Sequence, residues 1–308
     1  MVKMKHDNSN MLAFSSISQL MQYLEQPSPK HPLIVLVNYD EAAATVFEKN
    51  QKICIDFYKI SFKTNFKGRV KYGQGYYDFE EGGLAFLKPK QVVFSSDNPD
   101  SYQGYSLYFH PDFIRNYPLG SSITQYGFFS YAVSEGLFLS AKEKEIIRNL
   151  FDTIGTELEN NIDHFSQDVL VSQIELLLNY SNRFYNRQFI TRKTLNHDII
   201  TALDHLLEVY FTKNITSEQG LPSVEYFSTQ LNLSPRYLSD LLGSVTGQNT
   251  QQYIQDKLIN QSKDLLSSTS LSVAEIAYKL GFEHPQSFNK LFKTKTNQSP
   301  LQYRESFN

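Results

Sequence analysis

The chain repeats itself near its carboxyl end, and this repeat constrains the fold more than any other feature. The stretch SVEYFSTQLNLSPRYLSDLLGSVTGQNTQQY, which starts at Ser223, matches SVAEIAYKLGFEHPQSFNKLFKTKTNQSPLQY, which starts at Ser272. The serine at the start of each copy is a typical N-cap. Pro235, which matches Pro285, follows Ser234 as proline does at the first position of a helix. Each copy therefore predicts a helix, a short turn and a second helix.

The second helix of each copy is predicted to have one buried and one exposed face. The apolar residues that mark the buried face are Leu238, Leu241, Leu242 and Val245 in the first copy, and Phe288, Leu291 and Phe292 in the second. The residues predicted to face outward are Arg236, Tyr237, Ser239 and Asp240 in the first copy, and Gln286, Ser287, Asn289, Lys290 and Lys293 in the second.

A short helix with hydrogen-bonding side chains at its N-terminal end is the geometry that enters the major groove of DNA. There Gln and Asn bond adenine, and Arg or Lys bond guanine. Every amphipathic helix has a polar face, so one copy alone would be weak support for DNA binding. Two copies joined by the predicted helix TQQYIQDKLINQSKDLLSS would read successive major grooves, about 34 Å apart.

Residues 197–308 resemble the DNA-binding domain of the AraC/XylS family of bacterial transcription regulators. The stretch SVAEIAYKLGFEHPQSFNKLFKTKTNQSPLQYR carries most of the resemblance, and LSPRYLSDLLGSVTGQNTQQYI carries a weaker part. The resemblance implies seven helices, of which the third and the sixth read DNA. By position, it implies base-facing roles for Arg236, Ser239 and Asp240, and for Gln286, Asn289 and Lys290.

Charge distinguishes the two reading helices. The whole chain has 29 basic and 32 acidic residues, so any attraction to DNA must be local. The segment from His284 to Lys295 contains Lys290, Lys293 and Lys295 and no acidic residue. We therefore expect the second reading helix to supply most of the phosphate attraction. In the first helix, Asp240 could accept a hydrogen bond from a cytosine amino group or pair with Arg236, and the sequence leaves both open.

The first part of the sequence has the residue pattern of a β-domain. Between residues 34 and 109, short runs rich in Val, Ile, Tyr and Phe alternate with turn residues, which is typical of a sandwich or small barrel. In the order of its predicted elements and in its residue pattern, this half is similar to the cupin-like sensing half of the same family. The predicted fold is α+β: a cupin-like β-barrel sensing domain over residues 1–139, a helical dimerisation or linker region over 140–192, and an AraC-type DNA-binding domain over 197–308.

Two helices are expected after the β-domain. The S-x-x-E capping box of Ser140 and Glu143 opens the first, and Ser166 opens the second. These helices could pack on the β-domain or pair with the same helices of a second chain, and the sequence leaves both open. The polar segment NRQFITRKTLN, residues 186–196, reads as a linker.

Aromatic residues are the candidates for holding a ligand in the barrel, where tyrosine hydroxyls could bond a small polar molecule. The same residues would also suit a packed barrel core. The candidates are Tyr58, Tyr72, Tyr77, Phe86 and Tyr105. No two of the seven histidines lie within five residues of each other, and Cys54 is the single cysteine. This pattern predicts no metal site, no cofactor and no catalytic residues.

The sequence thus predicts a DNA-binding transcription regulator that is not an enzyme, with double-stranded DNA as its partner. The resemblance adds three further candidate partners: a small-molecule effector, RNA polymerase as the partner of an activator, and a second copy in a homodimer. The lack of a signal peptide or of an apolar run near ~20 residues predicts a cytoplasmic protein without a membrane partner. Two alternatives stay open. One is a helical protein-interaction module, and the other is a non-metal cupin enzyme with an appended helical domain.

Overall fold

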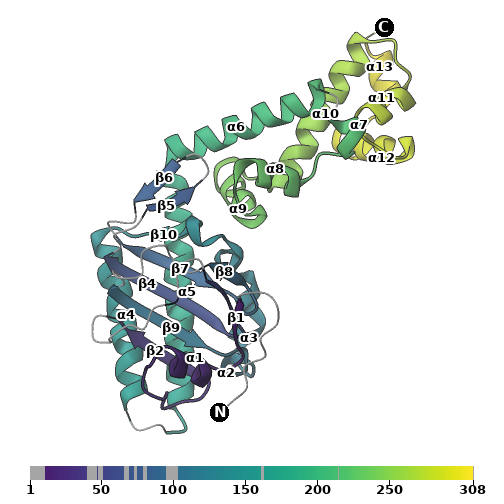
Figure 1. Ribbon diagram of the computed structural model, residues 1–308. Helices are drawn as coiled ribbons and strands as arrows, with labels where there is room; N and C mark the ends of the chain where they lie inside the picture. Colours follow the sequence, from purple (N-terminus) through teal and green to yellow (C-terminus); the bar gives the residue numbers. More distant parts are fainter. Residues whose placement is uncertain are drawn as a thin grey trace. The chain divides into compact units, whose positions relative to one another are not determined.

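The computed structural model describes residues 11–39, 47, 51–65, 69–72, 75–78, 82–94, 103–160, 163–213 and 215–307. The chain divides into two compact units, Met1–Gln188 and Phe189–Asn308. Every strand that the structure describes belongs to the first unit, whereas the second is built from helices (Figure 1). The predicted α+β fold class is confirmed.

The first unit contains two sheets and a separate hairpin. The larger sheet has the antiparallel order β10 (Leu137–Phe138), β7 (Gly83–Leu87), β4 (Tyr58–Asn65), β9 (Gln103–Phe109) and β2 (Ile34–Asn38). The smaller sheet has the order β1 (Met11–Phe14), β3 (Lys52–Ile55) and β8 (Val92–Phe94), and the hairpin pairs β5 (Arg69–Tyr72) with β6 (Gly75–Asp78). A buried cluster that includes Phe14, Ile53 and Tyr108 joins the smaller sheet to one face of the larger one.

Alternation along β4 assigns its side chains to two faces of the larger sheet. Ile60 and Phe62 lie on the face that is covered by helices. Phe62 stacks on Phe151 of α4 (Ala141–Glu159), with ring centroids 5.9 Å apart. On the same face, Phe86 of β7 lies 6.2 Å from Tyr185 of α5 (Ser166–Thr191). The opposite face is directed toward the smaller sheet, and this is the inner face of the sandwich.

Three of the five candidate ligand residues lie on the helix-covered face, so the prediction that they turn into the barrel is wrong for them. Tyr58 stacks on Phe109, with ring centroids 5.1 Å apart, and Phe86 is buried. Tyr105 is paired with Phe62 in the register of β4 and β9 and stacks on it. These rings form the core between sheet and helices. The side chains of the other two candidates, Tyr72 and Tyr77, lie outside the described part of the structure.

Shorter helices complete the first unit. They are α1 (Ile17–Tyr23), α2 (Pro111–Ile114), α3 (Pro118–Ser122) and the 3₁₀ turns Ile123–Gln125, Gly127–Ser130 and Val133–Glu135. The two long helices begin where the sequence predicts. Ser140 accepts a hydrogen bond from the Glu143 backbone N–H, and the Glu143 carboxylate accepts one from the Ser140 N–H, so the predicted capping box is confirmed. Helix α5 begins at Ser166.

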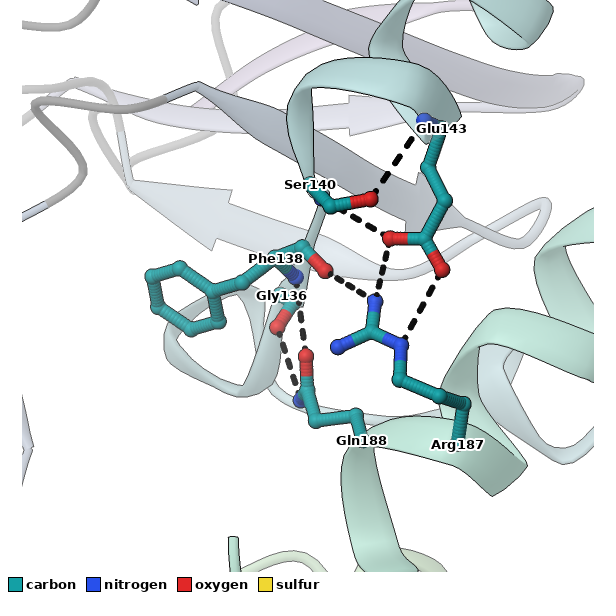
Figure 2. A network of polar contacts seen from close by, with 6 residues as sticks. All are labelled: Gly136, Phe138, Ser140, Glu143, Arg187 and Gln188. Atoms are coloured by element: carbon teal, nitrogen blue, oxygen red, sulfur yellow. Dashed lines mark hydrogen bonds and ion pairs between the residues drawn. The ribbon is translucent and has the colours of Figure 1, made fainter. Parts of the chain in front are cut away.

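The segment 186–196 is helical over most of its length, because α5 continues to Thr191 and α6 (Lys193–Thr212) starts two residues later, and the division between the two units falls within it, after Gln188. Its polar side chains anchor α5 to the loop before α4, as Figure 2 shows. Arg187 donates to both oxygens of Glu143, at 2.7 and 3.1 Å, and to the Phe138 carbonyl at 2.8 Å. Gln188 accepts from the Phe138 N–H at 2.9 Å. Arg187 and Gln188 thus use their polar side chains for hydrogen bonds within the first unit, and the reading of 186–196 as a linker stays a prediction.

The second unit contains the two predicted repeats. Its remaining helices are α7 (Thr216–Gln219), α8 (Val224–Leu231), α9 (Pro235–Thr246), α10 (Thr250–Ser268), α11 (Val273–Lys279), α12 (Pro285–Thr296) and α13 (Pro300–Glu305). Helices α8 and α9 form the first repeat, and α11 and α12 form the second. Ser223, Ser234 and Ser272 each accept the N-cap hydrogen bond that the sequence predicts.

Candidate nucleic-acid interface

Each reading helix is held by an apolar stripe on one side, which leaves the other side exposed. In α12, Phe288 and Phe292 are completely buried in a cluster that also contains Ile276 of α11 and Leu258 of α10. In α9, Leu238, Leu241 and Leu242 are completely buried. The predicted stripes are therefore largely confirmed, and the polar side chains between them set what each helix can contact.

The polar residues of α12 gather on its exposed side. Those predicted to face outward are all at least partly exposed: Gln286, Ser287, Asn289, Lys290 and Lys293. Asn289, Lys290 and Lys293 line a surface groove of about 460 Å³ together with the start of α13, including Pro300 and Leu301. Lys290 and Lys293 form no ion pair with any residue that the structure describes. Two cationic side chains are thus available on this helix to an anionic partner.

Lys295 differs from the other two lysines of α12. Its Nζ lies 2.8 Å from Oδ1 of Asp256 on α10, and Oδ2 of the same carboxylate accepts from Gln248 Nε2 at 2.7 Å. Asp256 therefore bridges the turn after α9 and the last turn of α12. Lys295 is thus paired with an acidic residue outside the segment from His284 to Lys295, and its predicted contact with DNA stays a prediction. Neither contact was predicted, because Asp256 lies on the connecting helix α10, 39 positions before Lys295.

Replacing Asp256 by Asn is expected to raise the affinity for duplex DNA about threefold to tenfold, because it removes an acidic group and releases Lys295. The slope of log K against log salt should steepen by up to about 0.9, the value for one added phosphate contact. A filter-binding titration at several salt concentrations measures both. Asp264→Asn, which removes an exposed charge from the same helix, is the matched control. Equal effects of the two variants would mean that Asp256 does not restrain Lys295.

The first reading helix carries an internal ion pair. Arg236 Nε lies 3.0 Å from Asp240 Oδ2, one helical turn away, and both side chains remain partly exposed. Of the two roles that the sequence left open for Asp240, the ion pair with Arg236 is formed in the structure. This helix therefore offers hydrogen-bonding groups with little net charge.

Two side chains of α9 were assigned to the wrong face. Tyr237 was predicted to face outward but is only 7% exposed, and its ring lies 5.2 Å from that of Phe189. Val245 was predicted to be buried but is 49% exposed. Contact with Phe189 buries Tyr237 near the start of α9, whereas Val245 near its end is left exposed. Tyr237 thus supports α9, and its ring is not on the exposed side.

Polar contacts also connect and cap other helices of the second unit. Asp204 of α6 accepts from Tyr253 and pairs with Lys257, both at 2.8 Å, and so holds α6 to α10. In the second repeat, a hydrogen bond from the Ser272 backbone N–H lowers the pKa of Glu275. The Glu275 carboxylate therefore remains charged at the positive end of α11, where it is favourable.

The described residues offer neither a metal cluster nor a membrane-spanning helix. Within those ranges, no group of three or more His, Cys, Asp or Glu side chains is arranged to hold a metal ion. None of the described helices combines the length and the apolar character needed to cross a membrane.

Comparison with known proteins assigns each half to a recognised domain. Residues 227–306 match the model of a helix-turn-helix domain, and residues 52–164 match the model of an AraC-like ligand binding domain. The HTH-type transcriptional activator RhaR of Salmonella typhi is 30% identical over 118 residues, which are 38% of this chain and 38% of RhaR. The uncharacterised HTH-type transcriptional regulator YfiF of Bacillus subtilis is 27% identical over 146 residues, 47% of this chain and 43% of YfiF.

The chain thus matches less than half the length of each of these two curated relatives. Among solved structures, the C-terminal domain of the response regulator yesN of Fusobacterium nucleatum is 32% identical. That match covers 33% of this chain and 96% of the yesN domain, with a TM-score of 0.29. At such a TM-score the superposition carries no weight, and the assignment rests on the two domain models and the sequence relatives. Residues that match an AraC-like ligand binding domain are thus followed by residues that match a helix-turn-helix domain, and the chain is similar over part of its length to HTH-type transcriptional regulators.

Proposed function

We propose that this chain is a sequence-specific DNA-binding transcription regulator that reads DNA through α9 and α12. The observation that carries the proposal is that two equivalent helix pairs flank one connecting helix, α10, and each exposes the polar side of its second helix. The carboxylate of Asp256 contacts residues of both repeats. Two recognition helices held in this way suit successive major grooves on one face of a duplex, about 34 Å apart.

The two helices have different proposed roles. Gln286 and Asn289 can bond adenine edges, and Lys290 and Lys293 can contact guanine or phosphate. Ser287 is a neutral donor beside them. In α9, Arg236 is the proposed guanine contact, held in position by Asp240, with Ser239 next to it. Because α12 has two lysines without an ion pair among the described residues, we propose that it supplies most of the salt-dependent affinity.

Selection of bound sequences from a random duplex pool tests this function. The purified full chain is incubated with the pool at low and moderate salt, and the enriched sequences are read. We expect a motif with two half-elements one helical turn apart, with stronger enrichment at low salt. A pool that shows no enrichment at either salt would contradict the proposal and favour a helical module that binds protein.

We further propose that the chain acts as a homodimer through α5. Phe165, just before α5, and Val169 and Leu176 within it are exposed at spacings of four and seven residues, which is the spacing of a helix–helix seam. Leu176→Glu is expected to shift the chain from dimer to monomer in sedimentation equilibrium, because it places a charge in that seam. Asn182→Glu, at an exposed site outside the spacing, is the control. A wild-type chain that sediments as a monomer at all concentrations would contradict the proposal.

The remaining parts of the proposal follow from the domain order. Residues 1–139 would sense an effector, residues 140–192 would carry the dimer seam, and residues 197–308 would bind DNA without enzymatic activity. RNA polymerase is a proposed partner, and the cytoplasm is the proposed location. Transcription in vitro from a template carrying the selected site would show whether the chain raises or lowers transcript output.

A further inference from the structure

The three lysines of α12 have no basic counterpart in α9. Both helices are 12 residues long. In the alignment of the two repeats, Lys290, Lys293 and Lys295 match Asp240, Gly243 and Val245, in that order. The one basic residue of α9, Arg236, is paired with Asp240 at 3.0 Å. Any contact that α9 makes with DNA therefore has to differ in kind from the contacts between lysine and phosphate that are open to α12.

Gly243 is the residue of α9 that most needs an explanation. A glycine in the middle of a helix lowers stability relative to alanine. Gly155, inside α4, is explained by packing, because a Cβ there would lie 3.1 Å from Cδ2 of Leu36. At Gly243 an added Cβ would meet no described atom within 4 Å, and φ is not positive. Nothing in the described part of the chain therefore requires glycine at this position.

Gly243 lies on the side of α9 that the proposed function directs toward DNA. It is exposed, and it follows Arg236 by seven positions and Asp240 by three, which places all three residues on one side of the helix. Its counterpart Lys293 lines the groove along α12 together with Lys290. At the position where α12 presents a lysine, α9 therefore presents its own backbone.

A lysine and a glycine make different contacts with a duplex. A lysine attracts phosphate, but its long side chain keeps the sugar–phosphate strand away from the helix. A glycine lets a ligand approach the helix backbone itself. Such an approach is sensitive to the width and the bending of the groove, and these depend on the DNA sequence. A close fit at Gly243 therefore adds selectivity without adding charge.

We infer that Gly243 is a specificity-determining residue, at which one DNA strand packs directly on the backbone of α9. The first repeat then selects its half-element by close fit, whereas the second repeat attracts DNA by charge through Lys290 and Lys293. This inference rests on the proposed function. Selection with the wild-type chain tests DNA binding without any change at Gly243, so failure of the proposed function and failure of this inference are distinguishable.

Two substitutions at Gly243 test the close fit, with binding of the full chain to the selected duplex measured by fluorescence anisotropy. Gly243→Ala is expected to weaken binding about fivefold, because its methyl group occupies the space of the strand. The same variant should be more stable to denaturant than the wild type, so an unfolded chain does not account for the loss. Gly243→Lys should weaken binding roughly tenfold or more, although it adds a positive charge.

Two further measurements separate close fit from charge and from general damage. Ala202→Lys, which adds the same charge at an exposed site of α6, is the control and should leave binding nearly unchanged. Selection from the random pool with Gly243→Ala should show a weaker sequence preference in one half-element and an unchanged preference in the other.

Binding by either Gly243 variant that equals or exceeds binding by the wild type would overturn the inference. Tighter binding by Gly243→Lys, with a salt slope steeper by about 0.9, would instead identify position 243 as an unfilled phosphate contact. A sequence preference that changes equally in both half-elements, or in neither, would also overturn the inference.

Discussion

Lys290→Glu is expected to weaken binding to the selected DNA site about 100-fold, close to 3 kcal/mol. Lys290 is exposed on the polar side of α12, forms no ion pair with the described residues, and lines the groove with Asn289 and Lys293. The substitution removes a cationic contact and places an anion against the phosphates, so attraction and repulsion change together. Fluorescence anisotropy with the selected duplex measures the loss.

The control for this experiment must carry the same change in charge away from DNA. Lys142→Glu does so at an exposed site in the first turn of α4, where an acidic residue suits the helix dipole. The slope of log K against log salt should also fall by about 0.9 in Lys290→Glu and stay unchanged in the control. Binding by Lys290→Glu that equals the control would show that α12 does not face the phosphates.

Gly281→Ala should lower the free energy of unfolding of the second unit by roughly 3 kcal/mol, which combines backbone strain with overpacking. Gly281 follows α11 and has a φ of +92°, as its predicted place after a helix suggested. A Cβ there would lie 2.5 Å from the Gly220 carbonyl oxygen and 2.6 Å from its carbon. Both atoms belong to the backbone, so the turn between α11 and α12 would have to move.

Two other glycines separate the causes of that loss. Gly247 has a φ of +76°, but a Cβ added there would meet no atom within 4 Å, so Gly247→Ala should show strain alone, about 1 kcal/mol. Gly243, inside α9 with open space around it, should gain about 0.5–1 kcal/mol as alanine. Hydrogen exchange of the α11 and α12 amides follows the second unit directly. A loss in Gly281→Ala no larger than in Gly247→Ala would mean that the approach to Gly220 is not tight.

Local features of the second unit could be predicted because short-range chemistry controls them. Ser223, Ser234 and Ser272 cap helices, and their hydroxyls reach backbone N–H groups three residues away in any folded context. The repeated helix pairs follow from helical spacing, which places Phe288 and Phe292 on one side of α12. The exposure of Lys290 follows from the same spacing.

The first unit shows where such reasoning stops. Alternation along β4 places Tyr58 and Phe62 on one face and Lys59 and Lys63 on the other. It does not say which face helices will cover. Because α4 and α5 cover the aromatic face, the predicted ligand residues Tyr58, Phe86 and Tyr105 lie in the core between sheet and helices. The lysines then lie on the face that meets the smaller sheet.

The sequence by itself determined where the serine-capped helices begin, the two repeats and the sharing of faces, because each depends on residues a few positions apart. The tertiary structure alone decided which partners those faces meet. Phe189 buries Tyr237, and Asp256 pairs with Lys295 across 39 positions of the chain. Arg187 joins Glu143 across 44 positions. Such contacts depend on how packed elements bring distant segments together. A local pattern of residues does not predict which distant segment its side chains will contact.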